Sequence, residues 1–153
     1  MKLNISRIML FALAPLVFGS AAQAQEINVR ARVPFNFVLG DKVYPAGEYT
    51  IQTAMAKTSF LSINNQGGTT QSLTRSIPCI SSQQDIPANR AKLVFHRIGN
   101  TYFLFRVWVG GSSVGREFPR SQHETHMAKN EPKTETALFA TNIVHVEETT
   151  TLP

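Results

Sequence analysis

The strongest constraint on the fold of this chain is an alternation between Ile27 and Leu39. Every odd position in this stretch is apolar, while the even positions carry Asn28, Arg30, Arg32, Pro34, Asn36 and Val38. Successive side chains of a strand point to opposite faces, so this pattern predicts antiparallel strand with one packed and one wet face. Because Pro34 has no N–H, we expect two strands or one bent edge strand.

Turn residues divide the next part of the chain. Gly40-Asp41 and Pro45 to Gly47 predict two turns, since proline presets its φ and glycine permits positive φ. Tyr49 then begins a further strand. The order of apolar residue, proline, glycine and tyrosine is also found in a tyrosine corner, where the hydroxyl bonds to nearby backbone. The alternative is that Tyr49 is an ordinary strand aromatic.

Two hairpins are predicted in the middle of the chain. The first joins residues 60–63 to residues 71–77 across the polar turn 64–68, and the polar stretch 78–89 follows it as a surface loop. The second joins residues 91–97 to residues 101–109 around Gly99-Asn100. We expect its pairs to include His96 with Phe103, Arg97 with Tyr102, Val94 with Phe105, and Ala91 with Trp108. Both faces are largely apolar, which predicts central strands that are covered on both sides or line a filled barrel, rather than sheet edges.

One short helix is expected near the C-terminus. A flexible connection at residues 110–115 comes first, and Ser121 with Glu124 then matches a capping box that predicts a helix over residues 122–129. A last strand is expected over residues 138–146. The fold class is therefore a single all-β domain over residues 25–146, an antiparallel sandwich or small barrel of about six to eight strands, with a frayed tail at residues 147–153.

The N-terminal segment has the pattern of a secretory signal. Lys2 and Arg7 precede an apolar run at residues 8–18, and small residues end in an Ala-Gln-Ala triplet, which predicts cleavage after Ala24. An uncleaved anchor or a buried first helix is the alternative. Removal of 24 of the 153 residues leaves 129, with 13 basic and 10 acidic side chains and a net charge of +3. We expect an exported protein of the periplasm, cell surface or medium.

Net charge and cysteine content limit the partners that the protein can bind and the ways in which its fold can be stabilised. A mild excess of positive charge is typical of a solvated surface, so no nucleic-acid partner is expected, and no later stretch is apolar enough to span a membrane. Cys79 is the single cysteine, so no internal disulfide can form and stability must come from an ordinary core. We expect Cys79 to be a buried small hydrophobe. The alternatives are a free thiol and an intermolecular bridge.

Four motifs occur in an order that resembles a group of short exported bacterial proteins of uncharacterised function. They are VPFNF at residues 33–37, PAGEYT at 45–50, LVFHR at 93–97 and GGSSVGRE at 110–117. The resemblance covers residues 29–117 and does not include the region after Pro119. The resemblance implies that the protein is exported and that these motifs belong to one domain. It implies no activity, ligand or catalytic residue, because none is known for the group.

Two patterns in the sequence partly match a metal site and a catalytic site. His123 and His126 are three residues apart, and Met127 stands where a zinc-protease helix needs its second histidine. Completing a site would need His96 or His145, so we interpret the pair as solvated and expect no metal. Ser113 lies in a Gly-x-Ser-x-Gly pattern, but Pro119 follows too soon for the helix that this motif requires.

The candidate interaction surface lies on the second hairpin. Its residues are His96, Arg97, Tyr102, Arg106 and Trp108. Arginines beside aromatic rings can hold single-stranded nucleic acids and some glycans, and the export signal argues against nucleic acid. A histidine on an apolar face can bind a ligand or transfer a proton. Cross-strand packing explains the same residues, with His96 partly buried and hydrogen-bonded to a neighbour.

These observations favour a non-enzymatic exported module that binds or supports a protein, an envelope component or a small molecule, without a cofactor. It would act through a concave sheet face or an exposed strand edge. One alternative is a carrier of a small apolar ligand, with a barrel interior lined by Phe35, Phe37, Phe103, Phe105 and Trp108. A second alternative is a hydrolase that uses Ser113 and a histidine.

Overall fold

The computed structural model describes residues 26–55, 58–68, 71–81 and 86–143. The predicted signal peptide, the end of the predicted last strand at residues 144–146 and the predicted tail lie outside the described residues. The described chain forms strands and one helix: β1 (Asn28–Val33), β2 (Phe37–Leu39), β3 (Lys42–Tyr44), β4 (Gly47–Thr53), β5 (Phe60–Asn65), β6 (Gln71–Arg75), β7 (Ile77–Ile80), β8 (Arg90–Ile98), β9 (Thr101–Val109), β10 (Val114–Glu117), α1 (Gln122–Asn130) and β11 (Lys133–Asn142).

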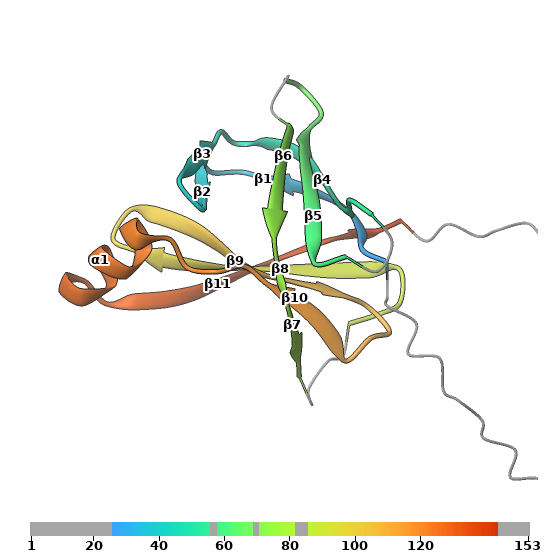
Figure 1. Cartoon of the computed structure of the whole chain (residues 1–153). Helices are drawn as coiled ribbons and strands as arrows, with labels where there is room; N and C mark the ends of the chain where they lie inside the picture. Colours follow the sequence, from blue (N-terminus) through green and yellow to red (C-terminus); the bar gives the residue numbers. More distant parts are fainter. Residues whose placement is uncertain (1–25, 56–57, 69–70, 82–85, 144–153) are drawn as a thin grey trace, which may run out of the picture.

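All the strands belong to one curled sheet in the order β3-β2-β9-β8-β11-β1-β4-β5-β6, with β10 between β9 and β7 (Figure 1). The sheet forms a half-barrel, which confirms the predicted all-β domain with one short helix. It has more strands than expected because several are only three or four residues long. One pairing, between β2 and β9, is parallel.

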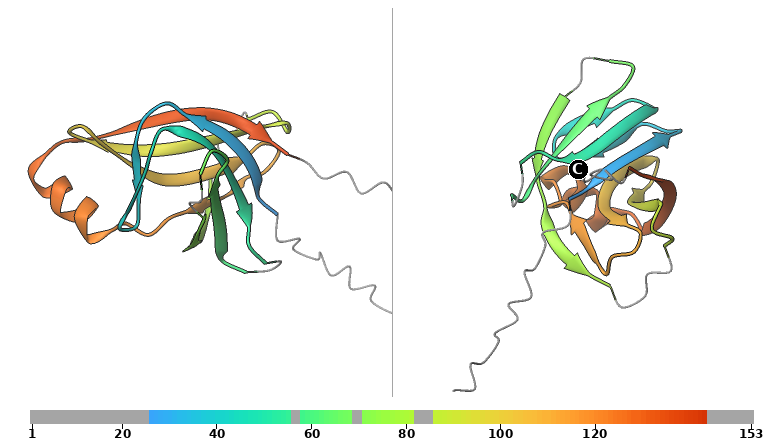
Figure 2. Two further views of the ribbon diagram at one scale, coloured as in Figure 1. Left: turned by 90° about the horizontal axis from the view of Figure 1, so that it is seen from above. Right: turned by 90° about the vertical axis from the view of Figure 1, so that its right-hand side faces the viewer.

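Strands β6 and β7 form one extended segment that changes partner at Ser76. β6 pairs with β5, whereas β7 pairs with β10. At the junction the amide and the hydroxyl of Ser76 both donate to the carbonyl of Ser59, at 2.7 and 2.9 Å. The two strands lie in line in Figure 1 and in the right-hand view of Figure 2, so this segment joins the two ends of the half-barrel.

The predicted alternation of the first strands is confirmed. Val29, Ala31 and Val33 are buried in the core, and Arg30 and Arg32 between them are exposed. β1 pairs with β11 and β4, so it is an interior strand, and a separate β2 follows the break at Pro34.

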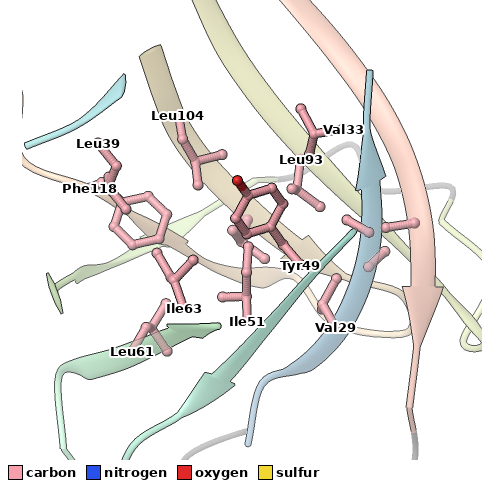
Figure 3. Packing of buried hydrophobic residues seen from close by; sticks show 14 of the residues in the cluster. Val29, Val33, Leu39, Tyr49, Ile51, Leu61, Ile63, Leu93, Leu104 and Phe118 are labelled. Carbon is pink, nitrogen blue, oxygen red and sulfur yellow. The ribbon is translucent and has the colours of Figure 1, made fainter. Parts of the chain in front are cut away.

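Tyr49 lies inside the half-barrel, among aliphatic side chains of several strands (Figure 3). Its ring is fully buried, and its hydroxyl donates to the carbonyl of Pro45, four residues earlier. The amide of Asn65 donates to the same hydroxyl at 3.4 Å. The tie from Tyr49 to nearby backbone is therefore present, as in the tyrosine-corner interpretation.

The hairpin of β8 and β9 turns at Gly99-Asn100, with Gly99 at φ 57°. The predicted pairs hold from Ile98 with Thr101 to Phe95 with Leu104. A bulge then makes Phe105 an extra residue, so Val94 pairs with Arg106 and Ala91 with Val109. The predicted pairs of Val94 with Phe105 and Ala91 with Trp108 are therefore wrong. Both faces of the hairpin are covered, as expected.

Several element boundaries differ from the sequence-based expectation, and three differ clearly. Ile77 to Ile80 form a strand although Pro78 was expected to begin a loop, and Val114 to Glu117 form a strand where a flexible connection was expected. β11 begins at Lys133, five residues before the predicted start. In each case pairing with a neighbouring strand orders residues whose own preferences are weak.

Candidate functional site

The bulge separates the residues that the sequence placed on one surface of the hairpin. Arg97 and Tyr102 lie on the core side of the sheet, where the Arg97 guanidinium is 5.6 Å from the Tyr102 ring and Phe35 stacks on Tyr102 at 3.9 Å. Arg106 and Trp108 lie on the opposite, outer face with His96. The single aromatic and basic face that was predicted is therefore wrong, because the extra residue in β9 reverses the faces that follow it.

His96 is fully buried on the outer face and is held by the helix. Its Nδ1 donates to Oε1 of Glu124 at 2.6 Å, and the side chain of Glu124 is 6% exposed. Its Nε2 makes no hydrogen bond within the described residues, and the nearest carboxylate oxygen belongs to Glu135, at 3.7 Å. The expected hydrogen bond of His96 to a neighbour is present, and its burial is deeper than expected.

Phe105 covers this pair. Its ring stacks on the imidazole of His96 at 3.8 Å, and three cations lie around it, with Arg106 at 4.2 Å, Arg120 at 5.7 Å and Lys133 at 6.0 Å. Carboxylates lie beside these cations. Arg106 pairs with Glu117 at 2.8 Å, and the Nε of Arg120 is 4.0 Å from Glu124. The cluster of His96, Glu124 and Phe105 is thus surrounded by charges of both signs, and the bond between His96 and Glu124 fixes α1 to the sheet.

Trp108 is also buried rather than available for binding. It packs with Ile86, Val94 and Phe105, and Cys79 lies against the same cluster. Cys79 is a free thiol of intermediate exposure, and burial is the main cause that raises its pKa. It packs against apolar side chains as expected, but it is only partly buried, so the expected full burial is not found.

The aromatic residues proposed to line a ligand cavity do not line one space. Phe35 and Phe37 belong to the core inside the half-barrel, Phe103 packs beneath Met127 of α1, and Phe105 and Trp108 form the outer cluster. The grouping that supported a carrier is therefore wrong. Two surface depressions are found elsewhere, one of about 270 Å³ between β2, β3 and His123, and one of about 620 Å³ between the β3–β4 and β5–β6 turns.

The other sequence candidates stay apart. Ser113 is exposed beside β10, and among the described residues no hydrogen bond joins its hydroxyl to a histidine. His123 is exposed and its ring lies 5.9 Å from that of Phe103, while His145 is outside the described residues. Within the described ranges no group of three histidine, cysteine or acidic side chains could hold a metal ion.

A strand edge that the sequence did not single out emerges from the partner change at Ser76. The amide of Ser76 points to β5 and that of Ser81 to Ser113, beside β10. The backbone N–H and C=O groups of successive residues point to alternate edges of a strand. In the segment formed by β6 and β7, the backbone groups of even residues therefore point toward β5, and those of odd residues point toward β10. In β6 the backbone groups of Gln71, Leu73 and Arg75 therefore face away from β5. No described strand pairs with this side, which we call the β6 edge.

The side of β6 that faces away from β5 and the side of β7 that faces away from β10 both lack a strand partner among the described residues, but they differ in composition. In β7 the residues that face away from β10 are Pro78 and Ile80, and Pro78 has no N–H to offer. The β6 edge contains no proline. Apolar side chains lie beside it on the outer face, with Leu73 58% exposed and Phe60, the cross-strand neighbour of Arg75, 40% exposed.

Comparison of the chain with protein-family models, curated proteins and solved structures gives no match. No helix within the described part of the chain has the length and apolar character needed to cross a membrane.

Proposed function

We propose that this protein is an exported, non-enzymatic interaction module that binds an extended segment of a partner protein along the β6 edge. The observation that carries the proposal is an edge of three residues that contains no proline and whose backbone donors and acceptors pair with no strand in the described part of the chain. Strand addition obtains its affinity from main-chain hydrogen bonds and its specificity from the side chains beside the edge. Export is proposed from the signal pattern of residues 1–24 and from the resemblance to exported proteins.

The side chains around the edge suit an apolar or acidic strand. Leu73 and Phe60 offer apolar surface, and Ile77, on the same outer face, is 52% exposed. Arg75 lies between them, and neither β6 nor β7 contains an acidic residue. Natural sheets protect edges of this kind with proline, bulges or charge, which is what Pro78 provides in β7. The β6 edge carries the charge of Arg75 but no proline, and this weaker protection beside Pro78 favours a binding role for β6.

The burial pattern favours surface recognition over catalysis or carriage. The histidine with the most elaborate surroundings, His96, is buried beneath Phe105 and does not line either of the two depressions described above. The inside of the half-barrel is filled by apolar side chains (Figure 3). What remains accessible is the outer surface, with the two depressions and the sheet edges, of which the β6 edge is one.

The test compares two substitutions at one position. Leu73→Pro removes an N–H from the β6 edge but leaves the bonds to β5, which use even residues, whereas Leu73→Thr keeps that N–H and serves as the control. Both proteins should keep the thermal midpoint of the wild type within a few degrees. We expect the wild type and Leu73→Thr to capture the same partner from extracts of the native envelope, and Leu73→Pro to lose it.

The added strand can also come from a second copy of this chain. Light scattering on the wild type, Leu73→Pro and Leu73→Thr measures the oligomeric state of each protein and tests this case. A dimer that is lost in Leu73→Pro and kept in Leu73→Thr would support pairing along β6. A monomer with no captured partner, or a partner retained equally by Leu73→Pro, would contradict the proposal.

A further inference from the structure

A second surface, on the outer face of β8, β11 and β1, is distinct from the β6 edge. β11 lies between β8 and β1 in this part of the sheet. Thr141 of β11 is paired with Arg90 of β8 on one side and with Arg30 of β1 on the other, and Phe139 of β11 is paired with Lys92 of β8. The neighbours of these residues along each strand, such as Ala91 and Ala140, are buried in the core. The register therefore gathers Arg30, Arg90, Lys92 and Phe139 on one side of the sheet, and we call these four residues the Phe139 patch.

Phe139 is the apolar centre of the patch. Its side chain is 60% exposed, whereas Leu138 and Ala140 on either side turn toward the core. The guanidinium of Arg90 lies 5.7 Å from the Phe139 ring centroid, a cation–π distance. An exposed phenylalanine on a regular strand, held beside a cation, can enter a soft apolar layer without any change of the backbone.

The cations of the patch are not neutralised in the way that those of the His96 cluster are. Arg106 has Glu117 at 2.8 Å and Arg120 has Glu124 at 4.0 Å. For Arg30, Arg90 and Lys92 no ion pair with a carboxylate is found among the described residues. The patch therefore presents three positive charges around one exposed aromatic ring.

We propose that the Phe139 patch binds the anionic headgroups of a lipid bilayer surface. Basic side chains next to an exposed aromatic ring fit an interface in which phosphates lie above an apolar layer. Neither depression described above is lined by the four residues of the patch, so a broad surface suits it better than an enclosed small molecule. The inference does not depend on the β6 edge, and together the two surfaces would place a partner strand at the membrane.

Sedimentation with vesicles tests this proposal. The probes are vesicles of phosphatidylcholine alone and of phosphatidylcholine with phosphatidylglycerol, each at low and high salt. The protein is purified after export and checked by mass spectrometry for loss of residues 1–24, because the apolar run at residues 8–18 would itself insert into lipid. We expect binding only to the vesicles that contain phosphatidylglycerol, and a steep loss of binding at high salt.

Substitutions then locate the surface. The double variant Arg90→Gln with Lys92→Gln should bind at least about tenfold more weakly, since each cation near an anionic surface contributes several-fold. Phe139→Ala should bind several-fold more weakly at unchanged net charge. Arg75→Gln, an exposed arginine on β6, is the matched control and should bind within twofold of the wild type.

Four outcomes would overturn the proposal. The first three are absence of binding to phosphatidylglycerol vesicles at low salt, weakening by Arg75→Gln as large as that by the double variant Arg90→Gln with Lys92→Gln, and retention of full binding by Phe139→Ala. Stronger binding to a soluble acidic polysaccharide than to vesicles would also reject lipid as the ligand. Circular dichroism of each variant confirms that a loss of binding is not a loss of fold.

Discussion

The imidazole of His96 on β8 and the carboxylate of Glu124 on α1 form a 2.6 Å hydrogen bond, and Glu124 is the buried residue of its helix. At the same time the backbone N–H of Glu124 donates to the Ser121 hydroxyl at 3.0 Å. Glu124 thus serves both the start of the helix and its attachment. Apart from Met127 and His123, the helix offers few side chains to the sheet.

Removal of this carboxylate should weaken the attachment of α1. Glu124→Ala leaves His96 buried without its partner, and the loss of one member of a buried pair costs about 3 kcal/mol. We expect a lower free energy of unfolding and faster amide exchange in α1 than in β8. Glu135→Ala is the control, since the Glu135 side chain is 57% exposed and should change stability by less than about 0.5 kcal/mol. Equal effects of the two substitutions would refute the role of Glu124.

Tyr49→Phe tests the tyrosine corner. The change removes the hydrogen bond to the Pro45 carbonyl and leaves that acceptor without a donor, while the ring still fills the core. We expect a loss of about 1–2 kcal/mol in chemical denaturation, with an unchanged denaturant slope. A neutral substitution would show that the hydroxyl contributes nothing to the fold.

The same residue should make the protein sensitive to alkali. Burial is the main cause that raises the pKa of Tyr49 above its ordinary value of 10.0, and the nearby Tyr44 adds to this effect. Above pH 10 the unfolded chain therefore releases the Tyr49 proton more readily than the folded chain does. Stability should fall as the pH rises from 10 through the folded pKa, and the fall should be smaller in Tyr49→Phe. Identical pH profiles for the two proteins would contradict this assignment.

Gly115→Ala tests the close approach of β10 to Trp108. A Cβ at this position would lie 2.3 Å from Cε3 of the indole ring, which is itself packed in the outer cluster. We expect a loss of about 1–3 kcal/mol from overpacking, together with a shift in the emission of Trp108, the single tryptophan. Gly67→Ala, where the nearest atom would be 3.7 Å away, is the control and should leave both observables nearly unchanged. An unshifted emission in Gly115→Ala would show that the ring does not occupy this position.

Much of the fold follows from local sequence signals. The alternation that starts at Ile27, the Gly99-Asn100 turn and the start of α1 at Ser121 depend on side-chain period, turn chemistry and capping, which act within a few residues. The all-β class follows from these signals together, and so does the central position of β8 and β9.

The candidate site could not be predicted in the same way. The bulge at Phe105 leaves no clear mark in the sequence, yet it moves Arg106 and Trp108 to the opposite face from Tyr102. The pairing of His96 with Glu124 joins residues 28 positions apart, and the capping-box pattern assigned Glu124 to the helix end only. The β6 edge depends on which strand each half of the segment pairs with. These are consequences of tertiary contacts rather than of local preference.

Amide hydrogen exchange in β6 tests the central claim, that this strand keeps one edge free for a partner. In the isolated protein we predict that the amide of Leu73 exchanges at nearly the rate of an unstructured peptide, while the amides of Ser72 and Thr74 are protected by β5. Residue-resolved spectra give the three rates in one experiment. Protection of Leu73 equal to that of Thr74 would show that the edge is already occupied, and would contradict the account.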